Sequence, residues 1–283
     1  MGQQKVTVKD IQKAKTDGRK LVMMTAYDYP FGLMADEAGV DIVLVGDSLG
    51  MVVMGLDGTV AVTMENMIHH IQAVMRGCKF AHVVGDMPFM SYNTSVRDAI
   101  INAGRLMKEG GCDSVKMEGG VDFAPTVEAI VKAGIPVQGH IGLTPQTASA
   151  LGGFKMQGKD ADAAKKIIDD ARALEDAGVF SMIIEAVPAP LAQLVAEAVS
   201  IPVIGIGAGA DVDGQVLVTH DMIGLFDKFI PKFVKQYTKI RPTIIEAIKA
   251  YKQDVLEKTF PGPEHSFSMP ADALEQLKKA ISE

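Results

Sequence analysis

The chain has 283 residues, and 48% of them are hydrophobic, which is enough to bury a sizeable core. Its 28 basic and 35 acidic residues give a formal charge of −7, and no lysine or arginine cluster stands out, so we expect no nucleic-acid partner. No apolar run approaches the roughly 18 to 20 residues of a membrane span, and the N-terminus lacks the apolar stretch of a signal peptide. Cys78 and Cys112 have neither disulfide nor metal-site spacing, and we expect a soluble, cytoplasmic protein without a membrane partner.

Apolar strand patterns alternate with amphipathic helical patterns about eight times along the chain. The predicted strands cover residues 21–26, 42–47, 82–86, 114–118, 135–140, 182–185 and 202–206, and a weaker pattern predicts an eighth strand over 229–234. The predicted helices between them cover residues 64–75, 96–108, 121–132, 161–177 and 190–199. Gly39, Gly134 and Gly178 each lie between a helix pattern and a strand pattern, where glycine suits a left-handed helix cap.

This alternation predicts an α/β fold with one catalytic domain, a (β/α)8 TIM barrel over residues 1–262, because such a barrel typically needs about 250 residues. Residues 263–283 are predicted to form a C-terminal tail with a short amphipathic helix. Its apolar stripe of Leu274, Leu277 and Ile281 would dock on the barrel or on a neighbouring subunit. An open, doubly wound sheet is the alternative, but a closed barrel better explains polar groups at the ends of adjacent strands.

Two glycine-containing segments follow predicted strands. Residues 143–160 are long for a connection from strand to helix, which predicts a lid over the active edge. Residues 205–210 match the loose G-x-G-x-x-G/A dinucleotide pattern, but too little chain follows to build a nucleotide domain, and no clear acidic partner comes at the expected distance. We interpret them as a loop after the seventh barrel strand that contacts a second substrate or simply turns tightly.

Polar side chains stand at the ends of five successive predicted strands. They are Asp47, Asp86, Lys116 with Glu118, His140 and Glu185, and Ser48 directly follows the first of them. The carboxyl ends of parallel strands meet at one edge of the sheet, where such folds hold their active sites. For any single strand-end aspartate, capping of the next helix is an equally good explanation. The repetition on five strands favours a common functional site.

Two aspartates at adjacent strand ends predict a metal site. Asp47 and Asp86 offer only oxygen ligands, which suit Mg²⁺ better than zinc. Mg²⁺ keeps positions that a 2-oxo acid can occupy through its carboxylate and ketone oxygens. The metal would then polarise the ketone and stabilise an enolate.

The other strand-end residues supply the remaining groups for such chemistry. Lys116 adds a fixed positive charge for the substrate carboxylate, and Glu118 shares its face of the strand. Ser48 can offer a hydroxyl group and a backbone N–H. Glu185, an acid at the end of a hydrophobic strand, is the best candidate for the base, whereas His140 is a nearby hydrogen-bonding group or an alternative base.

Many ordered blocks of the chain resemble the ketopantoate hydroxymethyltransferase family, and the resemblance covers nearly the whole sequence. The matching blocks are Met24-Thr25-Ala26-Tyr27-Asp28, Val45-Gly46-Asp47-Ser48-Leu49-Gly50-Met51, Asp86-Met87-Pro88-Phe89-Met90-Ser91-Tyr92, Val115-Lys116-Met117-Glu118-Gly119-Gly120, Gly139-His140-Ile141-Gly142-Leu143-Thr144-Pro145-Gln146, Ile204-Gly205-Ile206-Gly207-Ala208-Gly209 and residues 261–267.

The resemblance implies an enzyme of pantothenate and coenzyme A biosynthesis with a (β/α)8 barrel. It would transfer a hydroxymethyl group from the co-substrate 5,10-methylenetetrahydrofolate to 3-methyl-2-oxobutanoate through a Mg²⁺-stabilised enolate, forming 2-dehydropantoate. The family is similar to the phosphoenolpyruvate mutase and isocitrate lyase group, within the phosphoenolpyruvate/pyruvate-type superfamily. Its members are commonly decamers of two five-membered rings, which implies a homo-oligomer here.

The same resemblance implies roles for the strand-end residues. The implied roles are Mg²⁺ binding by Asp47 and Asp86, with Glu118 acting directly or through water; oxo-acid binding by Asp47, Ser48, Asp86 and Lys116; and proton acceptance by Glu185. From its place at a strand end, we add His140 to the residues that bind the oxo acid.

Two other functions stay open. One is a related Mg²⁺-dependent 2-oxo acid lyase or mutase, which would make or break a different bond with the same metal-enolate chemistry. The other is a non-catalytic barrel that binds a metabolite or acts as a scaffold. The charged strand-end set argues against the second, because buried charges cost stability when they have no partner.

Overall fold

The structure is a computed structural model that describes residues 4–150 and 152–282. Eight parallel strands form a closed barrel in which each strand pairs with its neighbours in the sequence and β8 pairs with β1, which confirms the predicted TIM barrel. The strands are β1 (Leu21–Thr25), β2 (Ile42–Val45), β3 (His82–Asp86), β4 (Ser114–Glu118), β5 (Val137–Gly142), β6 (Ser181–Glu185), β7 (Val203–Ile206) and β8 (Gly214–Leu217).

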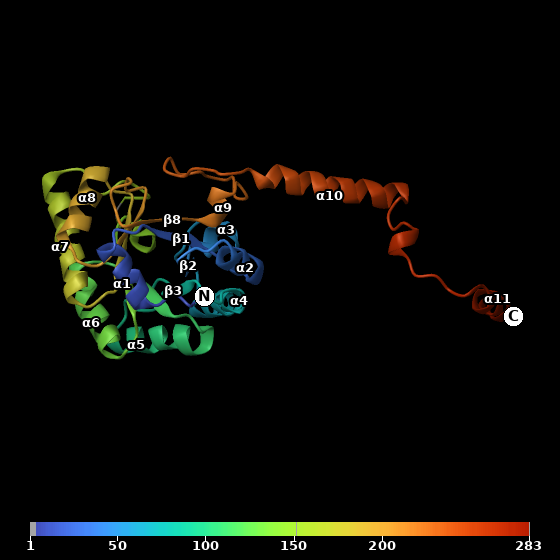
Figure 1. The fold of residues 1–283 in the computed structure, drawn as a ribbon, viewed down its shortest axis with the longest axis horizontal. Coiled ribbons are helices and arrows are strands. Elements are labelled where there is room, and N and C mark those ends of the chain that lie inside the picture. The colour runs from blue at the N-terminus through green and yellow to red at the C-terminus, as the bar shows by residue number, and fades with distance from the viewer. Residues whose placement is uncertain (1–3, 151, 283) are drawn as a thin grey trace.

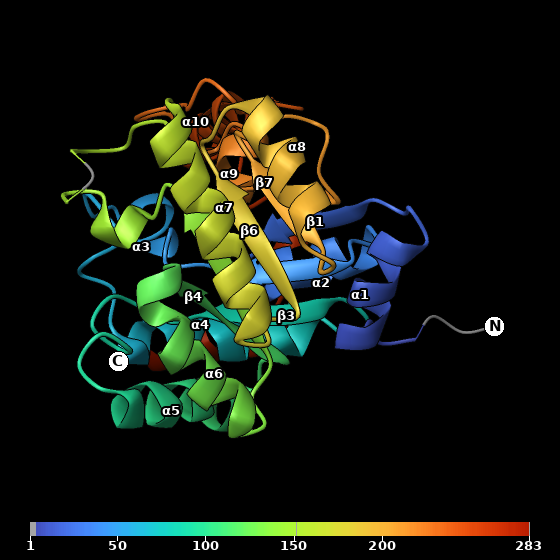
Figure 2. The ribbon, with the colours of Figure 1, turned by 90° about the vertical axis from the view of Figure 1, so that its left-hand side faces the viewer.

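A first helix precedes the barrel and packs against its amino-terminal end, and the helices that follow the strands cover the outside (Figures 1 and 2). They are α1 (Val8–Thr16), α2 (Tyr29–Glu37), α3 (Leu49–Val52), α4 (Met64–Gly77), α5 (Val96–Arg105) with a π-helical turn over Leu106–Gly110, α6 (Ala124–Lys132) after a 3-10 turn over Val121–Phe123, α7 (Ala161–Asp176), α8 (Ala189–Ala198) and α9 (Thr219–Met222). All five helices predicted from periodicity are present. The three predicted glycine caps are also confirmed, since Gly39, Gly134 and Gly178 have φ angles of 74°, 89° and 93°.

The predicted eighth strand is wrong. Residues 229–234 form an irregular segment in which Phe229 is 65% exposed, and Pro231 removes a backbone donor that a central strand would use. The barrel is instead closed by Gly214–Leu217, a short strand that begins with glycine and has little strand propensity of its own. Pairing with β1 and β7 selects this segment, so its strand conformation depends on tertiary contacts.

The barrel wall separates two packed layers. On β4, Val115 and Met117 point outward into the large core between strands and helices, whereas Lys116 and Glu118 alternate with them on the inner face. Inside the barrel, apolar side chains from six strands form a second core. Because the two layers alternate along one strand, a single residue shift would exchange apolar and charged side chains between them.

The amino-terminal end of the barrel is sealed. Ile11 and Ala14 of α1 are buried against the inner core. Between the strands, His82 Nε2 lies 2.9 Å from Ser114 Oγ, and Gln138 Nε2 donates a hydrogen bond of 2.9 Å to Ser181 Oγ. With this end closed by apolar contacts and neutral hydrogen bonds, substrates can enter only from the carboxyl end of the strands.

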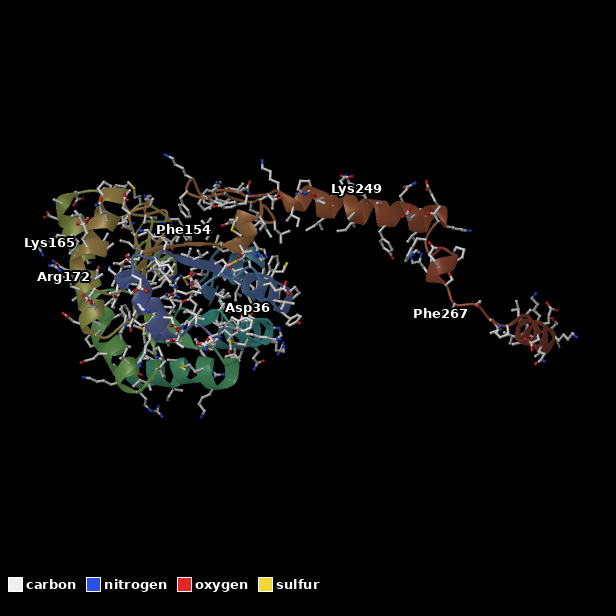
Figure 3. All side chains as sticks on the ribbon, viewed as in Figure 1. Asp36, Phe154, Lys165, Arg172, Lys249 and Phe267 are labelled. Carbon is white, nitrogen blue, oxygen red and sulfur yellow. The ribbon has the colours of Figure 1, made fainter. Side chains whose placement is uncertain are left out.

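The last part of the chain extends away from the barrel. Helix α10 (Ile240–Glu257) leaves it on one side, and α11 (Ala271–Ala280) lies beyond, with Phe267 on the segment between them (Figures 1 and 3). The predicted tail helix is therefore confirmed, while its docking surface and a domain boundary at residue 262 stay predictions. Among the described residues, no helix is both long and apolar enough to cross a membrane.

Closure of the barrel at β8 can be tested with an alanine in place of Gly214. An added Cβ would lie 2.6 Å from the backbone oxygen and 2.8 Å from the Cβ of Leu21 in β1, so we expect Gly214→Ala to lower the free energy of unfolding by about 1–3 kcal/mol. Gly104 in α5 is the matched control, because a Cβ there meets nothing within 4 Å and helix propensity should make Gly104→Ala neutral or stabilising. Urea denaturation measures both, and equal stability of the two variants would contradict this account of the closure.

Candidate active site

One cavity of about 620 Å³ opens at the carboxyl end of the strands. All seven residues singled out in the sequence line it: Asp47, Ser48, Asp86, Lys116, Glu118, His140 and Glu185. They come from β2 to β6 or from the residues directly after these strands. The structure therefore brings all seven predicted residues together at one cavity, and the role of each residue stays a prediction.

Two residues of this set form an ion pair between adjacent strands. Strand pairing places Asp86 beside Lys116, and Lys116 Nζ donates to Asp86 Oδ1 at 2.7 Å, with both side chains almost fully buried. Burial lowers the pKa of Lys116, but the negative charges of Asp86, Glu118 and Asp47 more than compensate and raise it above its usual value. Lys116 is therefore a permanent cation within the cavity.

Asp47 and Asp86 form a close acidic pair. The backbone N–H of Asp47 donates to Asp86 Oδ2 at 3.1 Å, which joins the ends of β2 and β3. Burial and the negative charge of Asp86 raise the pKa of Asp47 well above its usual range. The helix-capping explanation for Asp47 does not hold, because its carboxylate accepts from a side chain across the barrel and α3 has no side-chain cap. A second cation would relieve the repulsion between these two acids.

His140 lies between two carboxylates. Its Nδ1 is 3.3 Å from Glu118 Oε1 and its Nε2 is 3.2 Å from Glu185 Oε2. Burial and Lys116 lower the pKa of His140, but Glu118 and Glu185 outweigh them and raise it to about 9. Burial also raises the pKa of Glu118, yet Lys116 and His140 hold it below the usual value. His140 can thus orient Glu185 while Glu118 stays ionised.

Ser48 is held by a residue to which the sequence analysis assigned no role. The hydroxyl groups of Tyr27 and Ser48 lie 2.8 Å apart, and Tyr27 is 1% exposed. Tyr27 occurs two residues after β1, so its position after a strand end was visible in the sequence. Its aromatic ring, however, indicated core packing more than contact with a site.

Gln146 is the most important site residue that the sequence analysis missed. Its Nε2 donates to Asp47 Oδ2 and to the carbonyl oxygen of Met87, both at 2.9 Å, and its Oε1 accepts from the hydroxyl of Tyr92 at 2.7 Å. Its backbone N–H donates to Glu118 Oε2 at 3.1 Å. One buried amide thus connects the loops after β2, β3 and β5 and orients two acids. The signals in the sequence were its place four residues after β5 and its place in the family-matching block of residues 139–146.

The acids of the cavity suit a cation that also binds substrate oxygens. Of the acids that line the cavity, Asp47, Asp86, Glu118 and Glu185 lie at or near the ends of β2 to β6, where Lys116 and His140 bring positive charge. Within residues 4–150 and 152–282, no group of three or more histidine, cysteine or acidic side chains could hold a metal ion. Mg²⁺ commonly uses one or two protein carboxylates and completes its shell with water and substrate. Two aspartates with an open cavity beside them match that requirement.

The cavity walls are mainly apolar. Leu44, Ile183, Ile206 and Val216 of the barrel interior contribute to its lining. The glycine-rich loop directly follows β7 as predicted, and Gly207 and Gly209 also line the cavity.

The predicted lid segment also reaches the cavity. Phe154, Lys155 and Met156 line it, and the position of Phe154 can be followed in Figure 3. Leu151 of this segment lies outside the described residues. The segment is thus placed as a lid requires, while its closure stays a prediction.

Comparison with known proteins places these features in a family context. The family model described as ketopantoate hydroxymethyltransferase matches residues 5–263. The 3-methyl-2-oxobutanoate hydroxymethyltransferase of Carboxydothermus hydrogenoformans is 55% identical over 96% of this chain and 99% of its own. The protein of the same name from Heliobacterium modesticaldum is 57% identical over 94% of this chain and 96% of its own.

Solved structures share the fold at much lower identity. Phosphoenolpyruvate phosphomutase from Streptomyces platensis subsp. rosaceus has a TM-score of 0.61 at 15% identity, covering 98% of this chain and 96% of its own. A complex of phosphonopyruvate hydrolase with oxalate and Mg²⁺ has a TM-score of 0.60 at 10% identity, covering 97% and 96%. A 2,3-dimethylmalate lyase of the phosphoenolpyruvate mutase/isocitrate lyase superfamily has a TM-score of 0.55 at 14% identity, covering 97% and 96%. The barrel is thus of the type found in that superfamily.

The connecting role of Gln146 predicts a stability effect. Gln146→Leu would leave the Met87 carbonyl and the Tyr92 hydroxyl without their partners, and we expect it to lower the free energy of unfolding by about 2–4 kcal/mol. Tyr92→Phe removes only one donor and should cost about 1 kcal/mol. Because both changes remove the same hydrogen bond, the double variant should lose less free energy of unfolding than the sum of the losses in the two single variants. Urea denaturation of the unaltered protein, the two single variants and the double variant measures these losses. Strictly additive losses would contradict the hydrogen bond between Gln146 and Tyr92.

Proposed function

The chain belongs to the ketopantoate hydroxymethyltransferase family, and from this premise we propose how the barrel mouth performs the reaction. The chain is an enzyme that transfers a hydroxymethyl group to 3-methyl-2-oxobutanoate and forms ketopantoate, a precursor of pantothenate. The single observation that carries the mechanism is the convergence of two aspartates, a buried lysine and a Glu–His–Glu row on one cavity. The aspartates would bind the metal, the lysine would bind the substrate carboxylate, and the Glu–His–Glu row would contain the base.

Asp47 and Asp86 are the proposed protein ligands of Mg²⁺. Their repulsion, which raises the pKa of Asp47, would be relieved by a cation between them. When bound, Mg²⁺ would polarise the ketone of the oxo acid and stabilise the negative charge that develops on it. Glu118 would act through water, because Gln146 and His140 already face its two oxygens.

The substrate would be oriented by charge at one end and by apolar packing at the other. Lys116, a cation that faces the cavity, would attract the oxo-acid carboxylate, and Ser48 would donate its hydroxyl from the position set by Tyr27. The branched alkyl group would pack against the apolar wall formed by residues such as Leu44 and Ile183. This orientation would present the C3 hydrogen of the substrate to Glu185.

Glu185 is the proposed base. It is the last residue of β6 and less buried than the other acids, with a side chain that is 16% exposed, so it can face both the substrate and the cavity. The C3–H bond would break with the proton moving to a Glu185 carboxylate oxygen, and the electron pair left on C3 would form the bond to the one-carbon unit of the donor. Over the whole reaction both carbon–nitrogen bonds of that carbon would break, one water molecule would supply the oxygen of the new hydroxyl group, and the folate would leave with protons on both nitrogens. His140, 3.2 Å from Glu185 Oε2, would hold the carboxylate in place.

The one-carbon donor and the assembly complete the proposal. We propose 5,10-methylenetetrahydrofolate as the donor, since the cavity is much larger than a five-carbon acid requires. We also propose a cytoplasmic protein and a homo-oligomer, the decamer that the family resemblance implies. Large exposed apolar side chains on α10 and α11, such as Ile248, Leu256 and Leu277, support the oligomer. The lyase and mutase alternative is less well supported, because the mutase and the lyase compared above share only 15% and 14% identity with this chain and the fold alone.

The role of Glu185 predicts the outcome of proton exchange at C3. In D₂O, the unaltered enzyme should exchange the C3 proton of 3-methyl-2-oxobutanoate in the presence of Mg²⁺ and stop when a chelator is added, as followed by NMR. Glu185→Gln should slow the exchange by about 100- to 10,000-fold, the contribution of a general base, while metal binding stays intact. Glu197→Gln on the surface of α8 is the control and should exchange normally. Normal exchange in Glu185→Gln would rule out this residue as the base.

A further inference from the structure

A buried acid without a partner lies in the same cavity but outside the set described above. Asp221 of α9 is 7% exposed and contributes to the cavity lining. Among the described residues, its carboxylate takes part in no hydrogen bond and no ion pair; only its backbone N–H and carbonyl oxygen are bonded, the latter to Gly224 and Gln236. The neighbouring buried acids of the cavity all have such partners, which sets Asp221 apart.

The environment of Asp221 leaves it ionised and poorly solvated. Burial raises its pKa to about 6, which still leaves the carboxylate charged at neutral pH. A buried charge without a partner costs free energy, and such groups in an enzyme cavity often face a ligand. A ligand that pairs with Asp221 would supply N–H or O–H donors, or a positive charge.

Asp221 lies near Tyr27, the residue that contacts Ser48. The Tyr27 hydroxyl contacts Ser48, the Tyr27 ring lies 5.3 Å from the ring of His220, and the charges of Asp221 and Asp47 both add to the effect of burial in raising the Tyr27 pKa. Asp221 is thus near enough to meet a molecule that reacts at the strand ends. It belongs to the element after β8, whereas the proposed catalytic groups follow β2 to β6.

The surrounding walls indicate the shape of that molecule. Phe226 and Phe229 line the cavity on the segment that directly follows α9, and aromatic rings favour stacking with a flat heterocycle. Lys155 and Lys232 line it from exposed loops, and neither side chain forms an ion pair within the described part of the chain. A ligand with a flat N–H-bearing head and an anionic tail would match both features.

We infer that Asp221 binds the N–H edge of the reduced pterin ring of the one-carbon donor, with the anionic tail of the donor directed toward the lysines at the rim. This assignment rests on the proposed function, because it requires a folate as the second substrate. It separates two tasks within one cavity: β2 to β6 enolise the oxo acid, and the element after β8 holds the donor. Loss of Asp221 should therefore impair donor binding and spare C3 exchange.

The test measures both reactions in Asp221→Asn and Asp221→Ser. A hydrogen bond to a charged group is worth enough that the KM for 5,10-methylenetetrahydrofolate should rise by about 10- to 100-fold in both variants. The KM for the oxo acid and the C3 exchange in the absence of donor should stay within about twofold of the unaltered enzyme. Asp170→Asn, a half-buried acid outside the cavity that accepts from the Val121 backbone N–H, is the matched control and should change neither.

The possible results separate the two hypotheses. An unchanged donor KM in both Asp221 variants would overturn the inference. Loss of C3 exchange in a variant with a native circular dichroism spectrum would also overturn it, because Asp221 would then belong to the enolising site. Absence of C3 exchange in the unaltered enzyme would instead refute the proposed function itself. The exchange assay also reports folding, so a raised donor KM with normal exchange can come only from donor binding.

Discussion

The buried ion pair between Lys116 and Asp86 is the contact on which the organisation of this enzyme depends. Neither group could be buried alone, because an isolated charge in the protein interior costs several kcal/mol. Together they fix the ends of β3 and β4 in register, while Lys116 offsets the negative charge of Asp47 only in part. The remaining negative charge favours the binding of a cation at the carboxyl end of the barrel, and a substrate can then bind to that cation.

The barrel limits where this charge can be tolerated. Alternation along β4 puts Lys116 and Glu118 inside while Val115 and Met117 pack against the helices. At the opposite end, neutral hydrogen bonds such as that between His82 and Ser114 fill the interior and close it to solvent. The charged side chains of the barrel interior are thus confined to its carboxyl end. They lie beside a cavity in which substrate oxygens can complete the coordination of a bound cation. Gln146 fixes two of these acids, because its side chain donates a hydrogen bond to Asp47 and its backbone N–H donates one to Glu118.

Much of this site could be predicted from the sequence because it follows a local rule. Asp86, Glu118 and Glu185 end apolar strands, and parallel strands bring their ends together whatever the details of packing. The eighth strand could not be predicted in this way, because Gly214–Leu217 becomes a strand only through pairing with β1 and β7, whereas residues 229–234 have the stronger apolar pattern. Gln146 and Tyr27 were missed for a related reason: their roles depend on partners far away in the sequence. Helix α10 was also not predicted, and none of its residues is buried in the part of the chain that the structure describes.

The central claim is that Asp47 and Asp86 hold the metal that the oxo acid chelates, and electron paramagnetic resonance with Mn²⁺ in place of Mg²⁺ tests it most directly. With 3-methyl-2-oxobutanoate carrying oxygen-17 at the ketone, the account predicts broadened Mn²⁺ lines in the unaltered enzyme and in Glu118→Gln, since Glu118 acts through water. Asp47→Asn and Asp86→Asn should weaken Mn²⁺ binding and lose the broadening. A bound Mn²⁺ whose lines do not respond to the label, or tight binding that survives both aspartate changes, would contradict it.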